Sequence, residues 1–359
     1  MRAVIATEYT QVGAAETYLF SLAGQLARTG DEVELWVYPQ IHEEAARWVS
    51  GSGVRLIQMP EATRARLSFA FKRLRSLRPG IVHANQGVSP VLIAALAARV
   101  PGRFVTDHVL PKRPQFGWRG RVLRRLTMAS AREVVVFSQQ NARLASGSWE
   151  RTPVRVIYPG VPEPHCRKSA RVARADLGLP ADAIVVTSVG RLTEQKRMDV
   201  LVKALSRVGD RRVVGLVVGD GPDRRDLEGL VGSPGASARI DLTGHRADVG
   251  CILRATDIYV QCSAWEGICF AVLEAMASGL PCVTTEVPAL REAVGDTGLP
   301  AVAVGAVDEL AHAIRALADD DARRTALAHA LRARWERSFT VERMAEDHRA
   351  AYLTFSRSP

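Results

Sequence analysis

Residues 258–281, IYVQCSAWEGICFAVLEAMASGLP, decide the fold of this chain. The first four of them form a β-branched and aromatic run that predicts a buried strand. A helix is expected to begin near Gly267 and to end at Gly279, with Pro281 just beyond it. Open parallel α/β sheets bind their ligands at the carboxyl ends of the strands. We therefore expect the residues between this strand and this helix to face a ligand.

Two glutamates, Glu266 and Glu274, stand eight positions apart at the start of that helix. The helix N-terminus offers N–H groups on Gly267, Ile268 and Cys269 that suit a phosphate or a hydroxyl. Each of the two carboxylates could then bind a separate polyol group of one extended ligand. The alternative makes Glu266 a helix-terminal charge and Glu274 a surface residue. Because the neighbours of Glu274 are nearly all apolar, a carboxylate there is costly without a partner, and we favour ligand binding.

Short apolar runs alternate with helical patterns along the whole chain, which predicts an α/β protein with two parallel sheets. In the first half, strands are expected at residues 3–6, 33–37, 81–84, 104–106, 134–137 and 154–157, with a helix at 16–28. In the second half, they are expected at 184–188, 213–218, 240–242, 258–261, 282–285 and 301–304. The remaining pattern is helical, at 308–319, 321–334 and 341–355.

Three prolines within residues 158–164, YPGVPEP, predict a stiff connector between the two halves. We place the domain boundary there. This gives one domain at residues 1–163, a second at 164–340 and a final helical segment at 341–359.

The composition is that of a globular protein. The chain has 359 residues, of which 47% are hydrophobic and 24% charged, and this excludes disordered and fibrous classes. No apolar run is long enough for a membrane span, and Glu8 comes too soon for a signal peptide. The five cysteines are an odd number, and we expect them to be reduced and packed in a cytoplasmic protein.

Positive charge is concentrated in the first half. Residues 61–132, the basic window, hold fifteen Lys or Arg against two acidic residues and so have a net charge of +13. The whole chain has a net charge of +10, so the rest of it is slightly acidic. Anionic lipid, nucleic acid or a phosphate-bearing substrate are the candidate partners. The alternative is a general preference for arginine, since Arg outnumbers Lys by 43 to 5.

Three further loops follow expected strands of the second half. Residues 189–196, VGRLTEQK, present Arg191 and Lys196, which suit a diphosphate. Residues 217–222, VVGDGP, form a tight turn, and residues 243–246, TGHR, could turn backbone atoms toward a nucleobase. Each of these motifs is weak evidence when taken by itself.

The first half contributes a glycine loop and two histidines. Residues 11–16, QVGAAE, lead into a helix and could cradle a phosphate at Gly13. His83 and His108 are each expected at the carboxyl end of a strand, either facing a ligand or hydrogen-bonded within the fold. The sequence has no zinc or calcium ligand spacing, no P-loop and no G-x-S-x-G, so we expect a metal-free site.

Together, these motifs resemble those of the retaining glycosyltransferases of family 4. The most specific is E-x7-E, matched by Glu266 and Glu274, while VGRLTEQK, VVGDGP and TGHR occur in the family's order. Residues 13–16, GAAE, resemble the family's G-G-x-E loop, and residues 106–108, TDH, its T-x-H segment. The resemblance implies the GT-B fold, with two Rossmann-like parallel-sheet domains facing a deep cleft and a C-terminal helix that crosses back to the first domain.

The resemblance also implies which residues bind the nucleotide-sugar. Arg191 and Lys196 would hold the diphosphate and stabilise its charge as the sugar leaves. Glu274 would bind the ribose, and Glu266 would hold the hydroxyls of the donor sugar. The whole implied donor-binding set is Gly13, Arg191, Lys196, His245, Arg246, Glu266, Gly267, Ile268, Cys269 and Glu274.

Further roles follow from the same resemblance. Gly13 would approach the diphosphate from the first domain, which is the acceptor side, and His245 and Arg246 would offer backbone atoms to the base. The implied catalytic set is His108, Glu266, Arg191 and Lys196. The anomeric configuration would be retained by attack on the same face, without a metal, after closure around the proline-rich hinge has excluded water.

The sequence departs from the family pattern at two places. Ala14 replaces the second glycine of G-G-x-E, and Ile268 and Cys269 replace Phe and Gly of the usual E-G-F-G. These changes lie at the implied phosphate and sugar positions. They loosen the assignment of the donor sugar and leave the reaction class unchanged.

We therefore predict a metal-independent hexosyltransferase without a cofactor. Its donor would be a UDP-sugar in preference to a GDP-sugar, and its acceptor a glycan or lipid-linked molecule of the cell envelope. One alternative is a nucleotide-sugar epimerase of the same fold, and another is a nucleic-acid-binding protein that uses the basic window. A nicotinamide-dependent dehydrogenase is disfavoured, since no G-x-G-x-x-G follows the first strand.

The basic window contains two segments, residues 64–78 and 112–132, in which arginines are interleaved with apolar residues at helical spacing. Such segments favour peripheral association with the anionic inner face of the cytoplasmic membrane. The alternative is that the apolar residues face the core of the first domain and the arginines face water.

Overall fold

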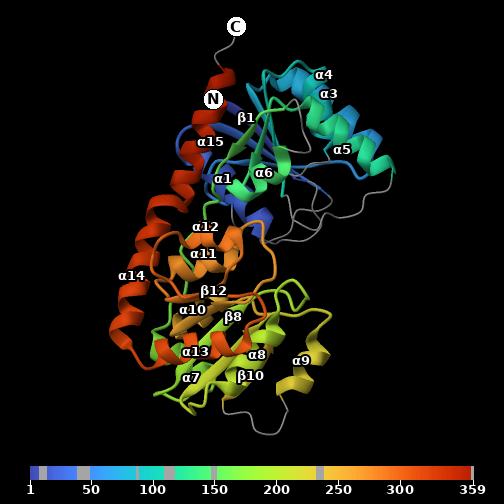
Figure 1. The fold of residues 1–359 in the computed structure, drawn as a ribbon. Coiled ribbons are helices and arrows are strands. Elements are labelled where there is room, and N and C mark those ends of the chain that lie inside the picture. The colour runs from blue at the N-terminus through green and yellow to red at the C-terminus, as the bar shows by residue number, and fades with distance from the viewer. Residues whose placement is uncertain are drawn as a thin grey trace. The chain divides into compact units, whose positions relative to one another are not determined.

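The computed structural model describes residues 1–7, 14–38, 49–85, 89–108, 118–146, 152–231 and 238–356 (Figure 1). The chain divides into two compact units. Unit 1 comprises Met1–Val161 and Ser338–Pro359, and unit 2 comprises Pro162–Arg337. Each unit has its own parallel sheet, which confirms the α/β class and the two sheets expected from the sequence.

The sheet of unit 1 has seven described strands in the order β3-β2-β1-β4-β5-β6-β7, all paired in parallel. They are β1 (Arg2–Thr7), β2 (Glu32–Val37), β3 (Arg55–Gln58), β4 (Ile81–Asn85), β5 (Gly102–Thr106), β6 (Glu133–Val136) and β7 (Val154–Val156). Every strand expected in this half is present, and β3 is additional. It lies at the edge of the sheet and none of its residues is fully buried, so its sequence lacks an apolar run.

Helices cover both faces of this sheet, because right-handed crossovers that run in opposite directions lie on opposite faces. The helix α1 (Ala14–Arg28) connects β1 outward to β2, and α15 (Val341–Ser356) packs against it. The connections from β3 to β4, from β4 to β5 and from β5 to β6 run in the opposite direction across the sheet. They contain α3 (Thr63–Leu77), α4 (Pro90–Ala97) and α5 (Trp118–Ser130), which Figure 1 shows grouped together. The short α6 (Gln139–Ser146) joins β6 to β7.

A buried polar network fastens α15 to the rest of unit 1. The Tyr352 hydroxyl lies 2.5 Å from His83 Nδ1, and His83 Nε2 lies 2.7 Å from Thr106 Oγ1. His348 Nε2 lies 2.7 Å from the Tyr18 hydroxyl. Burial lowers the pKa of His83 well below its ordinary value and that of His348 to about 4, so both rings are neutral at pH 7. His83 lies inside β4 and not at its end, which corrects the expectation of a strand-end histidine.

The sheet of unit 2 has six described strands in the order β10-β9-β8-β11-β12-β13, all parallel. The chain proceeds from β8 outward to β9 and β10 and then returns to the other side of β8 with β11. Such a reversal is a topological switch point, the place where open α/β sheets bind ligands. The strands are β8 (Ile184–Val189), β9 (Val213–Val218), β10 (Arg239–Gly244), β11 (Ile258–Gln261), β12 (Cys282–Thr285) and β13 (Ala301–Val302).

The helices of unit 2 pack in pairs beside this sheet, with α7 against α10 and α8 against α13. Their apolar faces join the strands in one large core cluster and a smaller one. The helices are α7 (Ala170–Asp176), α8 (Met198–Arg207), α9 (Arg224–Val231), α10 (Val249–Ala255), α11 (Phe270–Ala277), α12 (Pro288–Val294), α13 (Val307–Ala318) and α14 (Asp321–Ser338).

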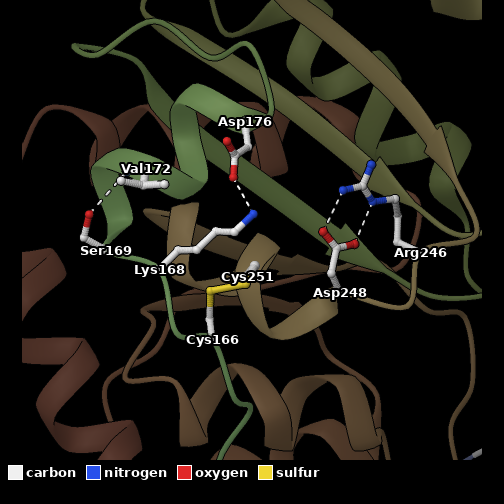
Figure 2. The surroundings of a disulfide bond; sticks show 8 residues. All are labelled: Cys166, Lys168, Ser169, Val172, Asp176, Arg246, Asp248 and Cys251. Carbon is white, nitrogen blue, oxygen red and sulfur yellow. Dashed lines mark hydrogen bonds and ion pairs between the residues drawn. A yellow bond between two sulfur atoms is a disulfide. The ribbon is translucent and has the colours of Figure 1, made fainter.

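A disulfide joins Cys166, just after the proline-rich connector, to Cys251 in the first turn of α10 (Figure 2). The two residues are 85 positions apart in the sequence, and their Cα atoms lie 4.8 Å apart. The expectation that all five cysteines are reduced is therefore wrong for this pair. Cys262, Cys269 and Cys282 are free thiols, and all three are buried.

Replacing Cys251 by serine should destabilise unit 2, because the disulfide restricts a long loop of the unfolded chain. A loop of this length corresponds to up to about 4.6 kcal/mol of unfolding free energy. We expect a lower thermal midpoint for Cys251→Ser than for the wild type without reductant. Dithiothreitol should lower the wild-type midpoint to that of the variant and leave the variant unchanged. A wild-type midpoint that does not respond to dithiothreitol would contradict this contribution.

Candidate functional site

The loops that follow β8 and β11 meet at the switch point of unit 2. Lys196, from the first loop, places its Nζ 2.6 Å from Oε1 of Glu266, from the second. Their side chains are only 17% and 5% exposed. Burial works to lower the pKa of Lys196, but the Cys269 sulfur and the Glu266 carboxylate outweigh it, and the pKa is raised. Two residues that the resemblance assigns to the donor are thus in direct contact.

Further hydrogen bonds fix the Glu266 carboxylate. The Ser263 hydroxyl donates to Oε1 at 2.6 Å, and Gln195 Nε2 lies 3.4 Å from Oε2. Gln195 also donates from Nε2 to the Trp265 carbonyl at 2.9 Å, and the backbone carbonyl of Gln195 accepts the Ala264 N–H at 2.8 Å. Both loops therefore hold the carboxylate in one position.

Glycines allow the neighbouring strand ends to approach this loop closely. A Cβ on Gly219, whose φ is +137°, would lie 1.9 Å from the Gly190 carbonyl oxygen. A Cβ on Gly221 would lie 2.2 Å from the Leu192 carbonyl oxygen. The motifs VGRLTEQK and VVGDGP therefore pack backbone against backbone, and only glycine fits at these positions. This contact supports the loop that carries Lys196.

The helix α11 begins at Phe270, three residues later than the sequence predicts, with Cys269 as its N-cap residue. Gly267, Ile268 and Cys269 therefore precede the helix and do not form its first turn. Within the described ranges, the N–H groups of Ile268 and Cys269 have no hydrogen-bond acceptor. These residues are 8% and 2% exposed, so a ligand that accepts from their N–H groups would satisfy buried donors.

Cys269 takes part in the site through its side chain as well. Its Sγ lies 3.9 Å from Lys196 Nζ and 3.4 Å from Gln261 Oε1. Burial raises the pKa of the Cys269 thiol to about 12, so the thiol stays protonated at pH 7 and can donate to Gln261. The sulfur therefore occupies space beside the ion pair where the family pattern has a glycine.

Glu274 lies in α11, between the buried residues Leu273 and Ala275. Its carboxylate has no ion pair or hydrogen bond to any described residue. Burial raises the pKa of Glu274 from its ordinary value of 4.5 to about 7. Two vicinal hydroxyls of a ligand would supply the hydrogen bonds that this carboxylate lacks.

The other implied donor ligands of unit 2 do not touch the Lys196–Glu266 pair in the described part of the chain. Arg191 and His245 are exposed, and the Arg191 guanidinium has no partner among the described residues. Arg246 is paired with Asp248 through two hydrogen bonds of 2.8 and 2.7 Å (Figure 2). Arg191 is therefore able to reach a ligand, whereas the Arg246 side chain already has an internal partner.

In unit 1, His108 follows β5, and its Nε2 lies 2.8 Å from Oδ1 of Asn85 at the end of β4. Its ring packs edge-on against Phe137, with ring centroids 4.9 Å apart. Burial lowers the pKa of His108 to about 4, so it acts as a neutral hydrogen-bonding group at pH 7. The expected phosphate contact at Gly13 lies outside the described residues.

Part of the basic window of unit 1 has a structural role. Arg73 forms an ion pair of 2.6 Å with Glu34, and Arg124 one of 2.6 Å with Asp107. Arg103 donates to the Ser130 carbonyl at 2.7 Å. Arginines of this kind support the alternative that we gave for the window, because their charge is used within the fold.

Three residues around Glu266 were not predicted from the sequence: Ser263, Gln261 and Gln195. Gln261 and Ser263 are two positions apart at the end of a strand, shortly before Glu266 in the sequence. These polar residues at a strand end were the sequence signal that could have indicated their place in the site. The role of Gln195 depends on the contact between two loops that are about 70 residues apart in the sequence, so the sequence alone does not indicate it. Among the described residues, no group of three or more His, Cys, Asp or Glu could hold a metal ion. None of the described helices has the length and apolarity needed to cross a membrane.

Comparison with known proteins identifies the family. Residues 13–163 match the family model described as Glycosyltransferase Family 4, and residues 183–320 match the model described as Glycosyl transferases group 1. The chain belongs to glycosyltransferase family 4. The resemblance inferred from the sequence motifs is thereby confirmed.

Curated relatives of this family 4 member include glycosyltransferases of envelope synthesis. It is 36% identical to the lipopolysaccharide core biosynthesis glycosyltransferase LpsE of Rhizobium meliloti, over 52% of this chain and 53% of LpsE. It is 26% identical to the putative glycosyltransferase EpsF of Bacillus subtilis, over 76% of each chain. The chain thus spans about half the length of LpsE.

Solved structures agree with the fold. The crystal structure of Anabaena HepE in complex with UDP and glucose superposes with a TM-score of 0.83, over 99% of this chain and 100% of HepE, at 20% identity. This likeness, together with the two Rossmann-like sheets, confirms the GT-B fold class.

Replacing Glu274 by glutamine should stabilise the protein above neutral pH. The pKa of Glu274 is about 7 in the folded state, above its ordinary value of 4.5, so ionisation disfavours folding. The penalty begins as the pH rises above 4.5 and is complete above 7, where we expect about 3 kcal/mol. Urea denaturation should show Glu274→Gln as the more stable protein at pH 8 and little difference at pH 5. The matched change at the exposed Glu286 should have no effect, and equal stability of Glu274→Gln and wild type at pH 8 would contradict the buried charge.

Proposed function

We propose that this family 4 member transfers a hexose-type sugar from a nucleotide-diphosphate donor to a glycan or lipid-linked acceptor of the cell envelope. The contact between Lys196 and Glu266 carries the proposal, because it joins a cation suited to phosphate to a carboxylate suited to sugar hydroxyls. The names of its relatives support the acceptor class. They include LpsE, a glycosyltransferase of lipopolysaccharide core biosynthesis, and a galactosyltransferase named for UDP-Gal and a diphosphoundecaprenol acceptor.

In this proposal, different residues of unit 2 bind different parts of the donor. Lys196 and Arg191 bind the diphosphate and stabilise the negative charge that develops as the sugar leaves. Glu266 accepts hydrogen bonds from sugar hydroxyls, and the N–H groups of Ile268 and Cys269 donate to the same sugar. Glu274 accepts from the ribose hydroxyls, which favour its ionised form. A UDP-sugar is the preferred donor, supported by the complex of HepE with UDP-glucose.

The reaction retains the anomeric configuration in this proposal. The bond between the anomeric carbon and the β-phosphate oxygen breaks, and the acceptor oxygen bonds to that carbon on the same face. The acceptor proton passes to the leaving phosphate, so the products are a glycoside and a nucleoside diphosphate. In unit 1, the neutral His108 keeps its proposed role as a hydrogen-bonding group for a sugar. No metal is required, because Lys196 and Arg191 supply the positive charge.

A thermal-shift panel with UDP, GDP, ADP and NAD in EDTA tests this proposal. A nucleotide at one hundred times its dissociation constant stabilises the folded state by ~2.7 kcal/mol, so the bound one should raise the midpoint clearly. We expect a shift with UDP or GDP that is lost in Lys196→Gln and kept in Lys203→Gln, a matched change at a lysine that pairs with Asp199 on α8. A shift with NAD alone, or with none of the four, would contradict a metal-free nucleotide-sugar site.

We also propose that the enzyme associates peripherally with the anionic face of a membrane. Support comes from α3, α4 and α5, which carry six of the nine large hydrophobic side chains exposed among the described residues. The described sequences of α3 and α5 contain no acidic residue. Cations beside apolar side chains suit an anionic lipid surface. The exposed residues are Leu67, Phe71, Leu96, Trp118, Val122 and Leu126.

Vesicle binding tests this surface. Val122→Glu/Leu126→Glu should abolish co-sedimentation with vesicles of anionic lipid at low salt, since each change places a carboxylate on an exposed apolar position of α5. The matched variant Val172→Glu/Val304→Glu alters two exposed apolar residues of unit 2 and should still sediment. Wild-type protein that stays in the supernatant would contradict membrane association.

A further inference from the structure

A chain of buried hydrogen bonds leads to Glu266 through the end of β11. The Tyr259 hydroxyl donates to Gln261 Oε1 at 3.1 Å, and Gln261 Nε2 donates to Ser263 Oγ at 2.8 Å. The Ser263 hydroxyl then donates to Glu266 Oε1 at 2.6 Å. Tyr259, Gln261 and Ser263 are each 0% exposed. Water therefore does not replace any link of this relay.

The direction of every bond in this relay is fixed. Ser263 has one hydroxyl proton, which it gives to the carboxylate, so its oxygen must accept from the Gln261 amide. The Gln261 carbonyl oxygen consequently faces the other way, toward the Tyr259 hydroxyl and the Cys269 thiol. Burial raises the pKa of Tyr259 well above its ordinary value and that of Cys269 to about 12, so both remain donors.

The relay occupies one oxygen of Glu266 and leaves the other with spare capacity to accept hydrogen bonds. Oε1 takes the bonds from Lys196 and Ser263, both at 2.6 Å. Among the residues that the structure describes, Oε2 has a single hydrogen-bond contact, at 3.4 Å from Gln195 Nε2. A carboxylate oxygen with spare lone pairs is the acceptor that a sugar hydroxyl needs. The backbone of Ser263 is held separately, because its carbonyl accepts the Thr285 hydroxyl at 2.7 Å.

We propose that Ser263 and Gln261 are positioning residues that aim Oε2 of Glu266 at a hydroxyl of the donor sugar. This inference rests on the proposed function. Neither residue touches the nucleotide in this account, because the relay ends at the carboxylate. Their loss should therefore weaken binding of the sugar part of the donor and leave binding of the nucleotide unchanged.

Ser263→Ala tests the relay by removing its last donor. We expect the affinity for UDP-glucose to fall about ten-fold or more, as for the loss of a hydrogen bond to a charged group, and the affinity for UDP to stay within about two-fold. Gln261→Met should act in the same direction but less, because Ser263 can still donate to Glu266. Calorimetric titration of both ligands gives the two affinities; GDP and GDP-mannose replace them if the nucleotide panel selects guanine.

Two comparisons separate positioning from a general loss of structure. Ser188→Ala removes a hydroxyl that is equally buried in β8 and has no hydrogen bond to any described residue, so it should leave both affinities unchanged. Glu266→Gln should weaken UDP-glucose, and adding Ser263→Ala to it should cause no further loss, because Ser263 acts through Glu266. Ser263→Thr keeps the hydroxyl and should recover most of the affinity.

Several results would overturn the inference. They are an unchanged UDP-glucose affinity in Ser263→Ala, an equal loss of UDP and UDP-glucose, and additive losses in the double variant. A wild-type protein that binds UDP and no UDP-sugar would refute the relay's role but leave a nucleotide site. A wild-type protein that binds no nucleotide at all would refute the proposed function, and the relay's role with it.

Discussion

The buried ion pair between Lys196 and Glu266 is the constraint on which the site of unit 2 depends. Two charges removed from water lose their hydration, and such a pair is stable only when further hydrogen bonds surround it. Ser263, Gln195 and Cys269 lie around the pair and satisfy this requirement. Those residues come from two loops, which the switch point between β8 and β11 brings together. The strand order of the sheet therefore determines which residues meet in the site.

Other features of the same site oppose stability and are explained by ligand binding. Glu274 lacks any partner among the described residues, and its pKa of about 7 reports the cost of its burial. The N–H groups of Ile268 and Cys269 are also unsatisfied within the described ranges. Unpaired acceptors and donors in one place mark a functional site, because a ligand would supply what the fold leaves out.

The sequence predicted the strands and the parallel class well, because buried strands have β-branched runs that are easy to recognise. It failed at β3, an edge strand with no fully buried residue, and at the start of α11, where the residues after Glu266 form an irregular segment. The disulfide between Cys166 and Cys251 was missed because spacing alone does not pair cysteines. Lys196 and Glu266 were both assigned to the donor by resemblance, but their contact is a property of the folded sheet.

The most direct test of the account is a crystal structure of the protein with the nucleotide-sugar that it binds. We expect a diphosphate oxygen within hydrogen-bond distance of Lys196 Nζ and a sugar hydroxyl within hydrogen-bond distance of Glu266 Oε2. We also expect the ribose hydroxyls at the Glu274 carboxylate. A donor bound elsewhere in unit 2, with the Lys196–Glu266 pair untouched, would contradict the role of this pair in donor binding.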